Sequence, residues 1–243
     1  ADLVLGQANF TSTSSGTTST TLSFPRSVAW DGANLWVADQ NNNRVLRYTN
    51  PVSNGQAASL VIGQTNFTNG TGRSAATFGT QALNTPTQVR VKGTKLFIVD
   101  KDDNRVLIYN TIPTASNPAA SVVVGQSTTT GSSSGTTSTT LSGPTGVDVT
   151  STGRLVVADT NNNRVLIYAS IPTANGEAAT NVVGQAGFGT STSGTTATTL
   201  NTPQSVAASA TGVLAVSDTQ NSRVLLWYET PTTDGSSAHA VIG

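Results

Sequence analysis

Asp159-Thr-Asn-Asn-Asn-Arg164-Val-Leu is one of four near-copies of a single stretch in this chain of 243 residues. In each copy an aspartate is followed five residues later by an arginine and then Val-Leu, and the copies are 61, 59 and 59 residues apart. Such a fixed period indicates a repeat architecture, because one unit cannot bury its apolar face alone and must stack on its neighbours. The pairs are Asp39 and Arg44, Asp100 and Arg105, Asp159 and Arg164, and Asp218 and Arg223.

Each repeat contains four short runs rich in Val, Ile, Leu and aromatic residues, which predict β-strands. In the first repeat they cover residues 25–31, 35–39, 44–48 and 60–63. The first run begins with a proline, which costs no ladder donor at that position, and a short glycine turn joins it to the second. Four antiparallel strands per repeat predict an all-β fold, a β-propeller with one blade per repeat. A stacked β-solenoid is the competing architecture, but its coils are usually parallel and the tight turn favours hairpins.

The predicted blades form a single repeat domain and cover approximately residues 25–63, 86–125, 144–184 and 203–243. Residues 1–6, with the sequence ADLVLG, are a fifth copy of the fourth strand and are predicted to be a spare outer strand. The sequence is compatible with a four-bladed ring or with a segment of a larger propeller or array. A spare strand can also complete a neighbouring subunit by edge addition, and repeated addition between like chains can give a filament.

Two stretches of each unit carry a family resemblance. Residues 25–31 read Pro-x-x-Val-Ala-x-Asp, and residues 35–45 and 155–165 read Leu-x-Val-Ala-Asp-x-x-Asn-x-Arg-Val. These stretches resemble the NHL-repeat β-propeller family, and the resemblance extends over all four units. The units here are near 60 residues rather than the about 40 to 45 that are typical of a blade. The resemblance implies a propeller, and rings of that family usually have more than four blades.

Long inserts separate the predicted blades, at residues 8–24, 65–85, 127–143 and 186–202. Serine and threonine make up 11 of 17 residues in the first insert and 13 of 17 in the third, and loops of this length are usually functional or disordered. We expect the inserts to share one face with the Asp-to-Arg turns. They are interpreted as architectural spacers, as an adhesion surface, or as a platform for O-linked sugar. Three sequons, at Asn9, Asn66 and Asn69, are candidate N-glycosylation sites.

The aspartate–arginine pairs are the strongest candidate site, with two interpretations. Four carboxylates near one face could hold a cation, and the run from Asp100 to Asp103 loosely resembles a calcium loop without its glycine and distal glutamate. Alternatively, each aspartate accepts backbone N–H groups in its own turn, and each arginine pairs with the aspartate or with carbonyl groups of a neighbouring blade. Recurrence in every blade favours the structural interpretation.

No catalytic constellation is visible. The chain has no cysteine, which excludes disulfides, thiol catalysis and cysteine-based zinc sites, and it has one histidine, His239. One histidine cannot form the multi-histidine zinc site that a resemblance to NHL-like lyases would imply. Glu177 and Glu229 lie in different repeats, so no paired acid and base is expected. Trp30, Trp36 and Trp227 are interpreted as packing residues rather than sugar platforms. No catalytic residue, cofactor or metal is therefore predicted.

Composition narrows the choice of partners. Charged residues are 10 % of the chain, with Lys+Arg and Asp+Glu equal at 12 each, so there is no basic stripe for nucleic acid. No apolar run approaches the roughly 18 residues needed for membrane insertion. We predict a non-enzymatic, extracellular or cell-surface structural propeller whose partner is protein, namely copies of itself in filaments or a surface layer formed through strand exchange. The alternative is a propeller that binds glycans at the cell surface, and a metal-dependent enzyme of the lyase or lactonase kind ranks third.

Overall fold

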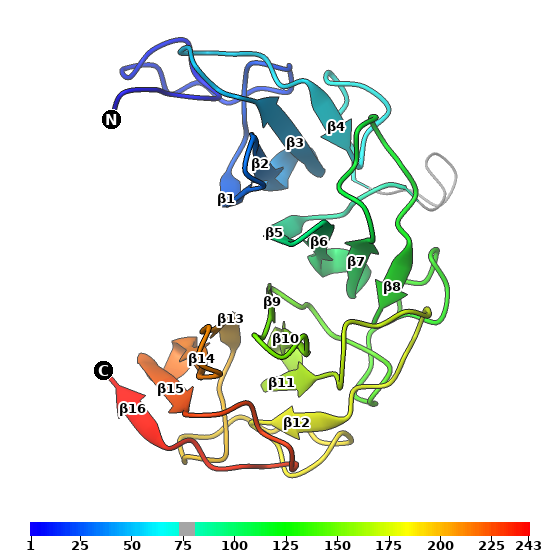
Figure 1. Cartoon of the computed structure of the whole chain (residues 1–243), viewed down its shortest axis with the longest axis vertical. Coiled ribbons are helices and arrows are strands. Elements are labelled where there is room, and N and C mark those ends of the chain that lie inside the picture. The colour runs from blue at the N-terminus through cyan, green and yellow to red at the C-terminus, as the bar shows by residue number, and fades with distance from the viewer. Residues whose placement is uncertain (73–80) are drawn as a thin grey trace. The chain divides into compact units, whose positions relative to one another are not determined.

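The computed structural model describes residues 1–72 and 81–243. In this part of the chain all the strands belong to four antiparallel sheets, each with four strands in sequential order (Figure 1). The regular helical segments of the described residues are short 3-10 turns. The predicted all-β fold of four-stranded propeller blades is therefore confirmed.

The strand bounds follow the predicted runs closely. The first blade contains β1 (Pro25–Trp30), β2 (Asn34–Asp39), β3 (Arg44–Thr49) and β4 (Leu60–Ile62), and the second β5 (Pro86–Lys92), β6 (Lys95–Asp100), β7 (Arg105–Tyr109) and β8 (Val122–Val124). The third contains β9 (Gly146–Val149), β10 (Leu155–Asp159), β11 (Arg164–Ile167) and β12 (Asn181–Val183), and the fourth β13 (Pro203–Ala208), β14 (Leu214–Asp218), β15 (Arg223–Trp227) and β16 (Ala240–Ile242). The 3-10 turns are η1 (Gln40–Asn42), η2 (Lys101–Asp103), η3 (Thr160–Asn162) and η4 (Thr219–Asn221).

The chain divides into two compact units. The first comprises Ala1–Asp102 and Ile108–Ser121, and the second comprises Asp103–Leu107 and Val122–Gly243. The first unit contains the whole β1–β4 sheet, and the second contains the β9–β12 and β13–β16 sheets.

In the second unit, the third and fourth blades pack face to face through one apolar core. Successive side chains of a strand point to opposite faces of its sheet, so Leu214 and Val216 face the third blade whereas Ala215 and Ser217 face away from it. The core joins Val156, Ile167 and Val183 of the third blade to Leu214, Val216 and Trp227 of the fourth, all of them buried. The burial of these residues can be compared with that of the equivalent residues in other blades.

Each outer strand ends in a glycine, because the following insert places a leucine directly on it. A Cβ atom on Gly125 would lie 2.6 Å from the Leu141 Cδ1 atom, and Gly125 has a φ of +88°, a conformation that side-chain-bearing residues rarely adopt. The same contact joins Gly6 to Leu22, Gly63 to Leu83 and Gly184 to Leu200. The inserts are therefore packed against the blades that they connect.

Two hydrogen bonds to the backbone N–H and carbonyl groups of one residue fix the middle of β4, β8 and β12, and we call this pair the outer-strand clasp. In the second unit the Val182 N–H group donates to Asp234 Oδ1 at 3.0 Å, and the Gly235 N–H group donates to the Val182 carbonyl oxygen at 2.9 Å. The same two bonds join Val123 to Asn175 and Gly176, Val61 to Ser116 and Asn117, and Val4 to Asn54 and Gly55. Residues 1–6 are thus clasped like an outer strand, although they belong to none of the four sheets.

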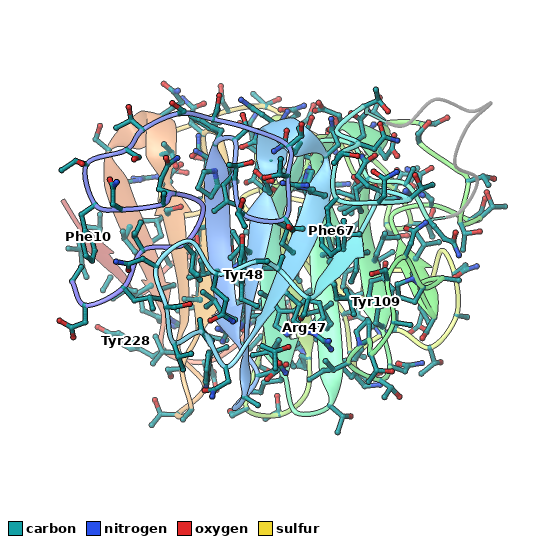
Figure 2. All side chains as sticks on the ribbon, turned by 90° about the horizontal axis from the view of Figure 1, so that it is seen from above. Phe10, Arg47, Tyr48, Phe67, Tyr109 and Tyr228 are labelled. Atoms are coloured by element: carbon teal, nitrogen blue, oxygen red, sulfur yellow. The ribbon has the colours of Figure 1, made fainter. Side chains whose placement is uncertain are left out.

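Tyr48, labelled in Figure 2, belongs to the apolar core of the first blade together with Val37, Leu46 and Val61. Its side chain is fully buried, and its hydroxyl has no hydrogen-bond partner among the described residues. Burial raises the pKa of Tyr48 from 10.0 to about 12; the Asp39 carboxylate acts in the same direction and Arg44 opposes it.

We expect Tyr48→Phe to change how stability depends on alkaline pH. Since the folded-state pKa lies above the unfolded value, the unfolded chain releases this proton first, and stability falls as pH rises from 10 towards 12. This one group contributes up to about 1.4 kcal/mol per pH unit to that fall. Urea unfolding at pH 8, 10 and 11 should show a shallower decline for Tyr48→Phe than for wild type. Tyr228→Phe, at an exposed position, is the control; an equal decline in all three proteins contradicts the prediction.

Candidate functional site

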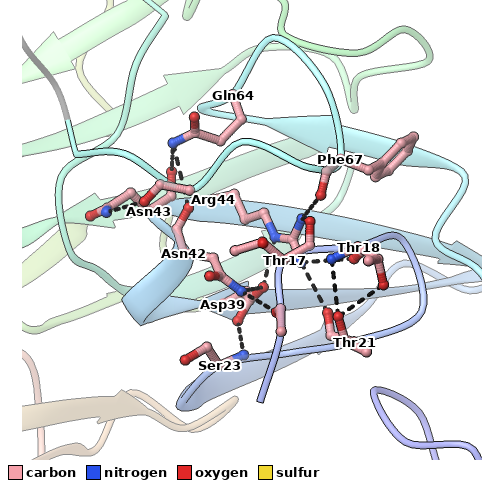
Figure 3. A network of polar contacts seen from close by, with 12 residues as sticks. Thr17, Thr18, Thr21, Ser23, Asp39, Asn42, Asn43, Arg44, Gln64 and Phe67 are labelled. Atoms are coloured by element: carbon pink, nitrogen blue, oxygen red, sulfur yellow. Dashed lines mark hydrogen bonds and ion pairs between the residues drawn. The ribbon is translucent and has the colours of Figure 1, made fainter. Parts of the chain in front are cut away.

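Asp39 and Arg44 form the centre of a buried polar network at the turn between β2 and β3 (Figure 3). The Arg44 Nε atom donates to Asp39 Oδ2 at 2.7 Å, and both side chains are fully buried. Asn42, in η1, donates to the same oxygen at 2.8 Å. The other carboxylate oxygen accepts the backbone N–H group of Ser23 at 2.6 Å. The carboxylate is thus surrounded by donors from its own turn and from the end of the insert.

The rest of the Arg44 guanidinium holds the inserts. Its Nη2 atom donates to the carbonyl oxygens of Thr18 at 3.0 Å and Thr21 at 2.9 Å. Its Nη1 atom donates to the carbonyl oxygens of Phe67 and Thr17. Phe67 belongs to the insert after the blade, whereas Thr17, Thr18 and Thr21 belong to the insert before it. One arginine therefore ties two successive inserts to the aspartate of the blade between them.

The network recurs in the other blades. Arg164 donates to Asp159 at 2.7 Å and to insert carbonyl oxygens of Thr136, Thr137, Thr140 and Phe188. Arg223 donates to Asp218 at 2.7 Å and to carbonyl oxygens of Thr195, Thr196 and Thr199, but its side chain is 16 % exposed. In the second blade Asp100 accepts the Asn84 N–H group at 2.6 Å, and Arg105 contacts Asp103 and the Thr129 carbonyl oxygen.

The geometry corrects one detail of the sequence interpretation. We expected each aspartate to accept N–H groups of its own turn, but no such capping bond forms at Asp39, Asp159 or Asp218. The carboxylates instead accept backbone N–H groups 16 or 17 residues upstream, at Ser23, Ser142 and Asn201. The reason is that the 3-10 turn directs the carboxylate towards the insert, where the backbone has no strand partner of its own.

Burial governs the electrostatics of this network. Removal from water raises the pKa of Asp159, against the opposing effects of Arg164, Asn162 and the Ser142 N–H group. An uncompensated charge at such a position is very unfavourable, so the ion pair stabilises the fold only while every donor is in place. The motif residues therefore act on the protein's own backbone, and all of them except Arg223 are buried.

The serine- and threonine-rich inserts have a regular local structure where it is described. Within the third insert the Gly135 N–H group donates to the Leu141 carbonyl oxygen at 3.1 Å, and the Thr137 N–H group donates to Thr140 Oγ1 at 3.0 Å. The first and fourth inserts repeat both bonds, with Gly16, Leu22, Thr18 and Thr21 and with Gly194, Leu200, Thr196 and Thr199. The second insert includes residues 73–80, which lie outside the described residues.

Two equivalent cavities lie beside the inserts. One, of about 440 Å³, is in the first unit, and the other, of about 500 Å³, is in the second. Both are lined by a glutamine, by serine and threonine residues of an insert, and by an Asn-Gly pair of an outer-strand clasp. The first includes Gln7, Ser14, Thr20, Asn54 and Gly55, and the second Gln126, Ser133, Thr139, Asn175 and Gly176. Their walls are neutral and rich in hydroxyl and amide groups.

The remaining candidates lie apart from this network. Trp36 and Trp227 are buried, whereas Trp30 is exposed on β1. His239 stacks on Tyr228 with ring centres 5.2 Å apart, and it accepts a hydrogen bond from the Tyr228 N–H group. Asn9 and Asn66 are exposed and Asn69 is partly buried. In Asn9 and Asn66, the side-chain oxygen accepts from the N–H group and hydroxyl of the sequon threonine.

Among residues 1–72 and 81–243, no three histidine, cysteine, aspartate or glutamate side chains are grouped so that they could hold a metal ion. In those residues there is also no helix with the length and apolar character needed to cross a bilayer.

The fold and its repeated network define a β-propeller repeat protein, and comparisons with known proteins agree. Residues 141–168 match the NHL repeat, which confirms the predicted resemblance for that unit. Comparison with curated proteins finds no match.

Several solved structures share the fold. An auxiliary nutrient binding protein from Bacteroides ovatus has a TM-score of 0.57 at 13% identity, over 85% of this chain and 48% of its own. The WD40 β-propeller domain of Doa1 has a TM-score of 0.51 at 8% identity, over 85% of this chain and 52% of its own. Virginiamycin B lyase from Staphylococcus aureus has a TM-score of 0.49 at 12% identity, over 84% and 52%. The chain thus spans about half the length of these structures, and at such identities the likeness to the first two shows the β-propeller fold alone.

We expect Arg164→Met to destabilise the protein strongly. The substitution leaves the buried Asp159 carboxylate and several insert carbonyl groups without their donor, and breaking a buried ion pair costs about 3–5 kcal/mol. Arg223→Met is the control, because Arg223 bonds to the equivalent aspartate and to the insert before its blade but lacks the bond corresponding to Arg164–Phe188 and is partly exposed, so its loss should be smaller. Urea unfolding measures both variants. An equally small loss in the two proteins would show that the network does not hold the inserts.

Proposed function

We propose that this chain is a non-enzymatic, extracellular structural module that joins copies of itself end to end through faces of its first and fourth blades. The observation that carries the proposal is a contrast in exposure at equivalent positions. Val28 on β1 is 64% exposed, whereas Val206, at the same position of the fourth blade, is 4% exposed within the apolar core against the third. Trp30, on the same strand, is 52% exposed. Exposed apolar side chains that gather on one sheet face are typical of protein interaction sites.

The fourth blade offers the complementary face. Ile242 is 59% exposed, although Val183 at the same position of the third blade is fully buried. In the packed junction the third blade uses Val156, Ile167 and Val183, and the corresponding residues of the fourth blade are Ala215, Leu226 and Ile242. The face of the first blade that corresponds to the other side of this junction carries Val28, Trp30 and Leu35, of which Val28 and Trp30 are exposed. Two copies can therefore reproduce, between chains, the contact that neighbouring blades make within one.

Two further features support this proposal over an enzymatic role at the aspartate–arginine motif. Apart from Arg223, which is partly exposed, the motif side chains are buried, and the arginines bond to backbone carbonyl groups of the inserts. The composition, with few charges and abundant serine and threonine, is typical of exported surface proteins. Exposed sequons at Asn9 and Asn66 are compatible with glycosylation in a host that provides it.

We expect wild-type protein to form larger species as its concentration rises, measured by sedimentation velocity and by electron microscopy of the same samples. Val28→Asp and Leu226→Asp each place a charge in the proposed contact and should reduce association at least tenfold. Val52→Asp is the control, because Val52 is exposed on a loop outside both faces. Monomeric wild-type protein at every concentration, or an equal loss in Val52→Asp, would refute end-to-end joining.

The two equivalent cavities favour a second candidate function, the binding of neutral glycans. Their hydroxyl- and amide-lined walls match the hydrogen-bonding groups of a sugar, and neither contains a charged residue. We expect neutral oligosaccharides to shift NMR resonances of Ser14, Thr20, Ser133 and Thr139. The variant Ser14→Trp with Ser133→Trp fills both cavities and should abolish the shifts. Shifts that persist in this variant would exclude the cavities as the binding sites.

A further inference from the structure

We propose that β16 is a placeholder, and that residues 1–6 of a second copy displace it and pair with β15 when two copies join. This inference rests on the proposed end-to-end association and names the strand that makes the joint. The occupant of the site is therefore a defined segment of this same chain.

The outer strand of a blade that has another blade after it makes two sets of contacts. β12 pairs with β11, with Val165 opposite Val183 and Ile167 opposite Asn181. The same strand is held by the outer-strand clasp, in which Val182 bonds to Asp234 and Gly235 of the next blade. A single strand thus completes the sheet of one blade and is gripped by the blade that follows.

At the first and fourth blades, two different segments make these two sets of contacts. β16 completes its sheet, with Ala240 opposite Leu226 and Ile242 opposite Val224, while Val241, the counterpart of the clasped Val182, is 59% exposed. Residues 1–6 have the complementary arrangement. Val4 is clasped at 2.9 Å and 3.0 Å by Asn54 and Gly55, but the segment pairs with no strand among the described residues. When a fourth blade meets the first blade of another copy, one of the two segments is surplus.

Chain continuity decides which segment remains. Residues 1–6 lead directly into the first insert, with Gly6 packed under Leu22 just as Gly184 is packed under Leu200. That insert is already held by Arg44 of the same copy through Thr18 and Thr21. A joint made by residues 1–6 therefore repeats the covalent path of every internal junction.

Side-chain chemistry favours the same exchange. The exchange places Leu3, Val4 and Leu5 where Ala240, Val241 and Ile242 lie in the separate chain. Leu3 would lie opposite Leu226, where Ala240 lies now, and a leucine buries more apolar surface there than an alanine. The equivalent position of the first blade also carries a leucine, Leu60, which is buried. Residues 1–6 thus resemble the outer strand of the first blade in side-chain size more closely than β16 does.

One feature makes the joint weaker than an internal junction. Asn163, which ends the η3 turn, accepts the Thr202 N–H group at 2.7 Å and donates to the Ser191 carbonyl oxygen at 2.8 Å, so it ties its blade to the next insert. Asn43 and Asn104 form the same two bonds. The fourth blade has Ser222 at this position, and its shorter side chain lacks the amide donor. The exchange is therefore expected to be reversible and concentration-dependent.

Cysteine pairs test the exchange cleanly, because the chain has no native cysteine. Leu3→Cys with Leu226→Cys should form covalent multimers on mild oxidation, since the exchange brings these residues of two copies opposite each other. Ala240→Cys with Leu226→Cys should form a disulfide within one chain, lock β16 in place and abolish association. Reduction of that disulfide should restore association. Each result is read by non-reducing gel electrophoresis and sedimentation velocity.

Weakening each segment separately gives the second test. Ala240→Pro removes a ladder donor from β16 and should lower the concentration needed for association at least tenfold, because the placeholder leaves more easily. Deletion of residues 1–6 should prevent association, and this variant should still end the assemblies of wild-type chains. Strand displacement is wrong if wild type associates, the Leu3→Cys with Leu226→Cys variant forms no multimers, and the oxidised Ala240→Cys with Leu226→Cys variant still associates. End-to-end joining would stand in that case. If wild type never associates, the proposed function itself fails.

Discussion

The inserts of this protein depend on a buried arginine. At Arg44 and Arg164, a planar guanidinium bonds to the aspartate of its own blade and to carbonyl oxygens of the inserts on either side. Loops so rich in serine and threonine bury little apolar surface, so hydrogen bonding to a fixed cation is what can order them. The Asp–Arg spacing is consequently constant, since the two residues must leave adjacent strands and meet across a 3-10 turn.

Much of the fold could be predicted from the sequence, because strand position is a local property. The runs around Val28, Val37 and Val45 alternate or cluster as strands do, and the repeat period places them in four equivalent blades. For the Asp–Arg motif, the sequence could predict the type of hydrogen-bond partner but not the particular residues. Asp39 bonds to Ser23 and Val4 bonds to Asn54, contacts that span 16 and 50 residues and exist only once the insert is folded. The Asn-Gly and Asp-Gly pairs at 54, 175 and 234 were an available signal for the outer-strand clasp.

Repeat equivalence also shows where the fourth blade differs from the others. Ala215 stands where the first three blades carry Trp36, Phe97 and Val156, and Ser217 stands where they carry Ala38, Val99 and Ala158. Both residues lie on the face turned away from the third blade. A smaller and more polar face buries less apolar area on contact, so a joint through it is weaker than the packed junction on the opposite face. Such a face is suited to association that responds to concentration.

Strand displacement reconciles a specific joint with a single chain in which all four sheets are complete. While β16 is in place, the edge of β15 is paired, and the sheet ends in a strand of only three residues, a short edge of the kind that limits aggregation. The exchange replaces one set of ladder hydrogen bonds by another, so its net driving force comes from what only the incoming segment adds. These additions are the larger side chain at Leu3 and apolar contact around Val28, while the clasp at Val4 is already formed in the separate chain and holds the incoming segment in place. A joint driven by such small differences selects its own repeat over other strands, because only this segment brings the matching insert with it.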